Sequence, residues 1–148
     1  MDGTRFRSRS VAALAVGAAT LTALFGCSLT TSAPDAPTDA HIVVSGTSTP
    51  LDLTVSTDFY QVQDTVTAEI HEVYNSSQTI TITPPYDQHW SIGSQARIAV
   101  HLKNTSASDV TVRMQIELDN GGQGYDHNST LPSGQELAYV YIFNQSIF

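Results

Sequence analysis

The side chains best suited to acid–base or metal chemistry in this sequence are its histidines. An imidazole changes charge near neutral pH and is the commonest metal ligand in proteins. The histidines are scattered, without the short spacings of a metal-binding motif, at His41, His71, His89, His101 and His127. Two or three of them could meet carboxylates across a β-sandwich, but isolated surface histidines are the simpler interpretation. The sequence therefore predicts no metal site and no cofactor.

The Gly-rich segment 119–128 is the most unusual polar stretch. Its Asp and Asn side chains offer the oxygen ligands that Ca²⁺ prefers, but the alternating acidic positions of an EF-hand loop are missing. No Gly-Lys-Ser/Thr follows, so the pattern is not that of a phosphate-binding loop. We expect a flexible connection that exposes Tyr125, Asp126 and His127 as part of a partner-binding surface. Whether the segment binds a cation stays open.

A second candidate partner-binding surface follows Pro84 and Pro85. Tyr86, His89 and Trp90 are expected on one loop there, and exposed Trp and Tyr are common anchors of protein contacts. The competing interpretation places Trp90 in the core at the start of a strand. The sequence contains no Gly-x-Ser-x-Gly elbow and no conspicuous carboxylate pair, and so predicts no catalytic residues and no enzyme.

Period-two alternation of apolar and polar residues predicts β-strands after residue 40. The expected strands are 41–44, 51–55, 65–74 (with Val66, Ala68 and Ile70 on one face), 79–83, 96–102, 110–118 and 137–143. The polar segment 104–109 is expected to join its neighbours as an antiparallel hairpin. The last strand is apolar on both faces, which favours a central position. Residues 41–148 are thus predicted to form a single antiparallel, immunoglobulin-like β-sandwich of about seven strands.

The N-terminal segment has the pattern of a secretory signal peptide. A basic start containing Arg5, Arg7 and Arg9 precedes an apolar run from Val11 to Leu24. That run is too short to span a bilayer comfortably. We expect residues 1–26 to be a signal peptide, and residues 27–40, which are rich in Ser, Thr, Ala and Pro, to form a flexible tether.

The end of this segment, Leu24-Phe25-Gly26-Cys27, resembles the lipobox of bacterial lipoprotein precursors. In that family the cysteine thiol accepts a diacylglyceryl group and cleavage occurs just before it. Phe25 is bulkier than the residue usually found there. Cys27 is the single cysteine of the sequence and so has no intramolecular disulfide partner. The resemblance implies lipidation at Cys27, with acyl chains such as palmitate, and an anchor on the extracytoplasmic face of the cell membrane. The Ala- and Thr-rich leader suggests an actinobacterial source.

The charge balance after Cys27 disfavours two classes of partner. Three basic residues, Arg97, Lys103 and Arg113, stand against thirteen acidic ones, which gives a formal charge of about −10. Such a surface repels phosphate backbones and offers no basic patch to anionic lipid headgroups. We therefore expect no nucleic-acid partner, and contact with the membrane only through the lipid anchor.

The order of features from residue 41 to 143 is similar to the periplasmic domain of MmpS-type accessory proteins of mycobacterial exporters. The similarity lies in Ile42-Val-Val-Ser-Gly46, the strand 51–55, the pair Trp90-Ser91 before a strand, and two final alternating strands. Those proteins usually have a membrane helix and two cysteines in the domain, whereas this domain has no cysteine. The resemblance implies a non-catalytic partner of a membrane transporter or another envelope protein. The alternatives are a small-ligand or lipid carrier, and a hydrolase or metal-dependent enzyme that uses dispersed His and Asp residues.

Overall fold

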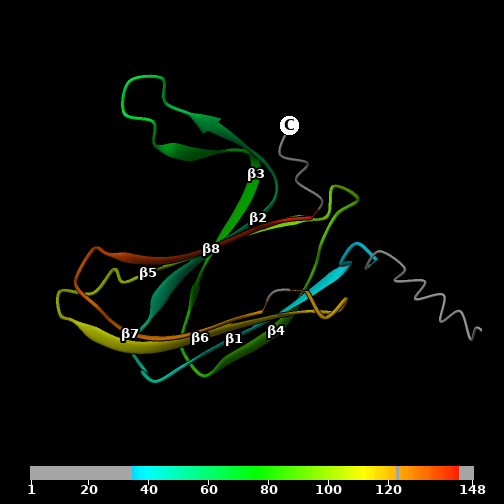
Figure 1. The fold of residues 1–148 in the computed structure, drawn as a ribbon. Helices are drawn as coiled ribbons and strands as arrows, with labels where there is room; N and C mark the ends of the chain where they lie inside the picture. Colours follow the sequence, from blue (N-terminus) through cyan, green and yellow to red (C-terminus); the bar gives the residue numbers. More distant parts are fainter. Residues whose placement is uncertain (1–34, 123, 144–148) are drawn as a thin grey trace, which may run out of the picture. The chain divides into compact units, whose positions relative to one another are not determined.

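The described residues, 35–122 and 124–143 of a computed structural model, form two four-stranded antiparallel sheets (Figure 1). The strand orders are β4-β1-β6-β7 and β3-β2-β5-β8. The predicted antiparallel β-sandwich is confirmed, with eight strands in the described part of the chain. The predicted signal peptide, Cys27 and the first part of the predicted tether lie outside the described residues. The strands are β1 (Asp39–Ser45), β2 (Leu51–Gln63), β3 (Ile70–Ile82), β4 (Tyr86–Ser91), β5 (Arg97–Lys103), β6 (Val110–Leu118), β7 (Tyr125–Leu131) and β8 (Glu136–Ile142).

The core lies between the two sheets and is built from the apolar positions of the alternating strands. Successive side chains of a strand point to opposite faces, so every second residue faces the other sheet. Burying one large aliphatic side chain contributes about 1.5–3 kcal/mol, which makes these positions the main source of stability. The alternation predicted for the two clearest strands is confirmed by the full burial of Ile98, Val100 and Leu102 on β5, and of Val112, Met114 and Ile116 on β6.

The hairpin predicted between β5 and β6 is wrong. β5 pairs with β2 and β8, whereas β6 pairs with β1 and β7, so residues 104–109 cross from one sheet to the other. Alternation determines which face of a strand is buried but not which strand lies beside it. The buried Asn104 organises the crossover: its Nδ2 donates to the carbonyl oxygens of Ser108 and Leu131, at 2.8 and 2.9 Å, and its Oδ1 accepts two hydrogen bonds from Ser106.

The last strand, β8, lies at a sheet edge and not at the centre as predicted. Its sequence is apolar at the positions of both faces for a different reason. Tyr139 and Tyr141 pack against the core on one face, while Val140 on the other face is only half-buried. Bulky aromatic side chains can thus give an edge strand the composition of a central one.

β2 and β3 form a hairpin of two 13-residue strands that extends beyond the rest of the sandwich (Figure 1). Irregular pairing between Val55 and Phe59 divides it into a proximal part in the sandwich and a distal part. The distal part, residues 59–74, is termed the arm. A separate strand at 79–83 is not present, because that segment continues β3.

The strand predicted for residues 65–74 begins too early, because residues 65–67 form the turn of the arm. Asp64 Oδ1 accepts hydrogen bonds from the backbone N–H groups of Val66 and Thr67, at 2.6 and 2.9 Å. These bonds lower the pKa of Asp64, the one to Thr67 most. Asp commonly stabilises turns in this way. This turn chemistry overrides the alternating pattern, so Val66 lies at the exposed tip and not on a buried face.

A small cluster of side chains, separate from the main core, holds the base of the arm against β5. Phe59 is fully buried there. Its ring meets the ring of Tyr74 edge to face, with 6.1 Å between the centroids. The guanidinium carbon of Arg97 lies 5.8 Å from the centre of the Phe59 ring, and the same guanidinium donates to the Phe59 carbonyl oxygen. The arm is therefore fixed at its base by packing and by a cation–π contact.

A hydrogen-bonded chain runs beside this cluster and involves His101, which was expected on a solvated face. Glu136 Oε1 accepts a hydrogen bond from His101 Nδ1 at 3.2 Å, and His101 Nε2 lies 2.5 Å from the Tyr74 hydroxyl. Burial, and then the nearby Glu72 and Glu136, raise the pKa of Tyr74, which keeps the phenol protonated as the donor. His101 is half-buried because the arm covers it.

One glycine in the turn after β1 is required by the backbone. Gly46 has a φ of 94°, and an added Cβ would lie 3.1 Å from the Thr111 carbonyl oxygen. Gly46→Ala is therefore expected to lower the free energy of unfolding by about 1–3 kcal/mol. The matched control is Gly93→Ala, where a Cβ meets nothing within 4 Å. Urea denaturation of both variants measures the difference, and equal midpoints would contradict the expectation.

Candidate functional site

The outer face of the first sheet carries two Asp-x-His sequences on neighbouring strands. Asp39 and His41 lie on β1, and Asp87 and His89 lie on β4, with His41 directly opposite His89. The two imidazole rings stack with 4.5 Å between their centroids and 7° between their planes. These four residues are termed the histidine–carboxylate cluster.

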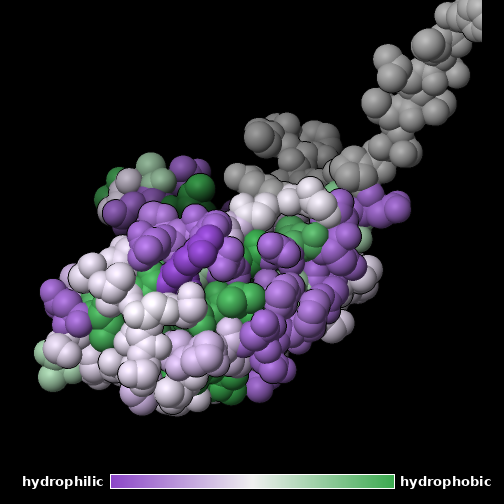
Figure 2. Space-filling model, turned by 90° about the horizontal axis from the view of Figure 1, so that it is seen from below, coloured by the Kyte–Doolittle hydropathy of each residue, from purple (hydrophilic) through white to green (hydrophobic). Residues whose placement is uncertain are grey.

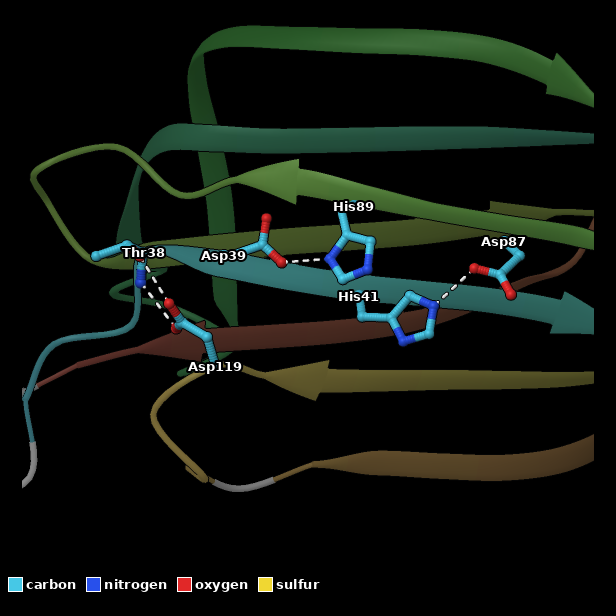
Figure 3. Close-up of polar contacts among 6 residues, drawn as sticks. All are labelled: Thr38, Asp39, His41, Asp87, His89 and Asp119. Atoms are coloured by element: carbon cyan, nitrogen blue, oxygen red, sulfur yellow. Dashed lines mark hydrogen bonds and ion pairs between the residues drawn. The ribbon is translucent and has the colours of Figure 1, made fainter.

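Each histidine of the cluster bonds to the carboxylate of the other strand. His41 Nε2 donates to Asp87 Oδ1 at 2.7 Å, and His89 Nδ1 donates to Asp39 Oδ1 at 2.6 Å (Figure 3). The bonds are diagonal because alternate residues of a strand share a face, and antiparallel pairing places each Asp beside the histidine across the ladder. These two hydrogen bonds also link the edge strand β4 to β1.

A surface hollow of about 190 Å³ adjoins the cluster. Asp39, His41 and His89 line it together with Glu117, Leu118 and Asp119. Its lining thus combines imidazoles with carboxylates and contains no hydroxyl, thiol or amine nucleophile. Figure 2 looks onto this side of the molecule, where hydrophilic residues predominate.

The carboxylate of Asp119 is already engaged by the chain that enters β1. Its Oδ2 accepts from the Thr38 hydroxyl at 2.6 Å, and its Oδ1 accepts from the Thr38 N–H at 2.9 Å (Figure 3). These bonds lower the pKa of Asp119, with the hydroxyl contributing most. They stabilise the fold above the ordinary carboxyl pKa, and that stabilisation is lost as the pH falls through the lowered value.

The hydrogen bond to Asp39 raises the pKa of His89 above 6.5, with smaller contributions from the charges of Asp39 and Asp87 opposed by desolvation. A raised histidine pKa means that the folded state holds the proton more tightly than the unfolded chain does. The stabilisation is therefore complete below about pH 6.5 and is lost as the pH rises through the higher folded value. The cluster is a proton-binding feature of this face.

We expect nuclear magnetic resonance titration to give His89 a pKa above 6.5, and Asp39→Asn to bring it back toward 6.5, because the main acceptor for its proton is then neutral. Glu117→Gln is the control, since Glu117 is not among the causes of the shift. An unchanged His89 pKa in the Asp39→Asn variant would show that this hydrogen bond is not the cause.

The cluster can take up a proton and can accept cationic or hydrogen-bonding groups at the exposed hollow beside it. Because the rings of His41 and His89 are parallel, their nitrogen lone pairs do not converge on one point, as the ligands of a metal ion must. In the described part of the chain, no three His, Cys, Asp or Glu side chains are arranged to hold a metal ion.

The predicted surface of Tyr86, His89 and Trp90 is not a loop but the edge strand β4. Strand alternation sends its residues to opposite faces. Tyr86 and Trp90 are half-buried against the core, where Trp90 Nε1 donates to the Tyr86 hydroxyl at 3.0 Å. His89 alone of the three faces outward, into the cluster. Trp90 is therefore partly packed against the core, as the competing interpretation of its position predicts.

Tyr125, Asp126 and His127 begin strand β7, at the other edge of the same sheet. β1 and β6 lie between the two sets, so the structure does not bring the six predicted residues together. Tyr125 packs against Tyr139 across the sandwich, with 5.4 Å between ring centroids. Asp126 forms a bidentate ion pair with Arg113 on the outer face, at 2.6 and 2.8 Å.

The Gly-rich connection is shorter than predicted, because β7 starts at Tyr125. Its polar groups serve the local structure. Asn120 Nδ2 donates to the Asp35 carbonyl oxygen at 2.8 Å, and Asn120 Oδ1 accepts from the Gly122 N–H at 2.8 Å. With Asp119 bonded to Thr38, the described side chains of this connection hold the chain that leads into β1.

Sequence reasoning missed two features that the structure brings out. The first is the histidine–carboxylate cluster, whose signal is the repeated Asp-x-His spacing on two strands that turn out to be neighbours. The second is the arm, which carries all the exposed large hydrophobic side chains of the described residues. They are Tyr60 (47% exposed), Val62 (42%), Val66 (91%), Ile70 (58%) and Val73 (38%).

Residues 35–122 and 124–143 include no helix with the length and apolar character needed to cross a membrane. Comparisons with protein-family models, with curated protein sequences and with solved structures find no match for this chain. The functional inference therefore depends on the surfaces of the molecule itself.

Proposed function

We propose that this protein is a membrane-anchored extracytoplasmic lipoprotein whose β-sandwich is a non-catalytic accessory domain for a protein at the cell envelope. The observation that carries the binding role is the concentration of exposed apolar side chains on the arm. Exposed apolar side chains gathered on one element of a protein surface are typical of interaction sites. A membrane transporter is the partner class that the sequence resemblance implies.

The arm suits binding because it is both exposed and fixed. The Phe59 cluster holds its base, and the Asp64 hydrogen bonds order its tip. A preorganised element loses less conformational entropy when it binds than a flexible loop does. The arm can thus present its apolar residues to a partner at a low entropic cost.

The proposed anchor places the domain close to the membrane. The eleven residues between Cys27 and Asp39 span at most about 40 Å when fully extended. A domain held by this tether reaches membrane proteins and their extracytoplasmic domains. Two or more acyl chains on Cys27 would make that attachment stable.

The anchor is tested by the intact mass of protein extracted from host membranes with detergent. We expect a chain that begins at Cys27 and carries acyl groups, and loss of that modification in Cys27→Ala. An unmodified mass that retains residues 1–26 would overturn lipidation and favour an uncleaved anchor.

The binding role is tested by placing a photo-crosslinking amino acid at Val66 in the tip of the arm, with Thr111 on the outer face of β6 as the matched control. We expect one reproducible envelope protein to be crosslinked from position 66 and not from position 111. Tyr60→Ser together with Val73→Ser should reduce that product strongly, while the domain stays folded. Crosslinking that is equal at both positions, or absent at position 66, would overturn the proposal.

A further inference from the structure

The outer edge of β3 in the arm has few of the features that usually prevent strand pairing. β3 is the terminal strand of its sheet, with β2 as its neighbour on one side only. Exposed edge strands are normally protected by Lys, by Pro or by their shortness. β3 is 13 residues long, and its sequence, Ile70–Ile82, contains no Lys, Arg or Pro. Its one irregularity is the bulged pairing near Ser76, below the arm.

The two faces of the arm differ in chemistry. Residues directly opposite in an antiparallel pair share a face. Tyr60 lies opposite Val73, and Val62 lies two positions further on the same face. The other face carries Glu72, which lies opposite Gln61. On β3 itself, a strand added at this edge would therefore meet Val73 and His71 on one face, and Glu72 between Ile70 and Tyr74 on the other.

The charge of the arm decides what kind of strand fits. Residues 59–74 contain Asp64, Glu69 and Glu72 and no Lys or Arg. A second copy of this chain supplies little compensating charge. Arg113 is paired with Asp126, and Arg97 lies against Phe59 at the base of the arm, which leaves the exposed Lys103 against thirteen acidic residues. A membrane surface fits poorly as well, because insertion of the tip would desolvate the carboxylates beside it.

We propose that the outer edge of β3 in the arm, residues 70–74, binds an extended segment of a partner protein in which apolar and basic side chains alternate. This inference rests on the proposed binding role and names the chemistry of the partner. The segment pairs with the backbone of β3 as an added strand. Its apolar side chains extend the surface of Val62 and Val73, and its Lys or Arg side chains lie beside Glu72.

The probe is the peptide acetyl-Lys-Val-Lys-Val-Lys-Val-Lys-amide, added to the isotope-labelled full domain. We expect amide shifts confined to the arm, and nuclear Overhauser contacts between the peptide backbone and residues 70–74. Glu72→Lys should weaken binding at least tenfold, whereas Glu117→Lys on the other sheet should change it little, although both substitutions alter net charge equally. Phosphatidylcholine vesicles without peptide should produce no shifts in the arm.

A peptide with the same composition but D-valines tests the strand geometry. It keeps the charge and apolar content and cannot pair as a regular strand with an all-L edge. Equal binding of this peptide, absence of binding by the all-L peptide, or shifts spread over both sheets would each overturn the inference. If the all-L peptide fails while position 66 still crosslinks one envelope protein, the accessory role stands and the strand-pairing partner does not. Loss of both results overturns both.

Discussion

Replacing Phe59 by Ala is expected to lower the free energy of unfolding by about 3–5 kcal/mol, the range found when a buried aromatic ring is removed. The ring is fully buried, meets Tyr74 edge to face and lies under the Arg97 guanidinium. Its removal leaves a cavity and takes away the cation–π contact. Much of the loss should occur at the base of the arm, because Phe59 lies outside the main core.

Equilibrium urea denaturation and limited proteolysis together check this expectation. Tyr60→Ala is the matched control one residue away, and its half-exposed ring should cost less than about 1 kcal/mol. In Phe59→Ala we expect faster cleavage within residues 60–73 before global unfolding, since local opening becomes easier. Wild-type stability and cleavage in this variant would show that the arm is not held by the Phe59 ring. The yield of the product crosslinked from position 66 should fall as the arm becomes less ordered.

Replacing Asn104 by Ala is expected to lower the free energy of unfolding by about 2–4 kcal/mol. The side chain is fully buried and satisfies the carbonyl oxygens of Ser108 and Leu131 and the N–H of Ser106. Alanine leaves the Leu131 carbonyl oxygen buried without this partner and removes the hydrogen bonds to the part-buried groups of Ser106 and Ser108. Each such group costs about 1–3 kcal/mol, and water entering the site offsets part of that cost.

The control for this variant is Asn128→Ala, an exposed asparagine on β7. It should shift the denaturation midpoint little. Unlike Phe59→Ala, Asn104→Ala should leave arm proteolysis near the wild-type rate in native conditions, because Asn104 joins the two sheets far along the chain from the arm. A midpoint unchanged from wild type would mean that the crossover does not depend on these hydrogen bonds.

The two variants separate stability from the proposed binding role. If the arm is the binding element, Phe59→Ala should impair partner crosslinking more than Asn104→Ala at a temperature where both remain folded. The opposite order would place the binding surface elsewhere, and the histidine–carboxylate face would then be the next surface to test.

The sequence alone determined the class of fold and the buried face of each clear strand. Alternation in β5 and β6 predicts which side chains are buried, and the structure confirms this prediction. The lipobox-like Cys27 is likewise a property of local sequence, and it remains the basis of the proposed location.

The tertiary structure alone decided which strands are neighbours, and therefore which side chains share a site. His41 and His89 are 48 positions apart, yet β1 pairs with β4 and places them in contact. The same pairing rules separated Trp90 from Tyr125, which lie at opposite edges of one sheet. Alternation with a period of two determines which face of a strand is buried but not which strand lies beside it, because each strand edge offers the same backbone groups to any neighbour. The arm was hidden for a related reason: the turn at Asp64 depends on hydrogen bonds between a side chain and the backbone, which the alternation of Val66 and Ile70 masks.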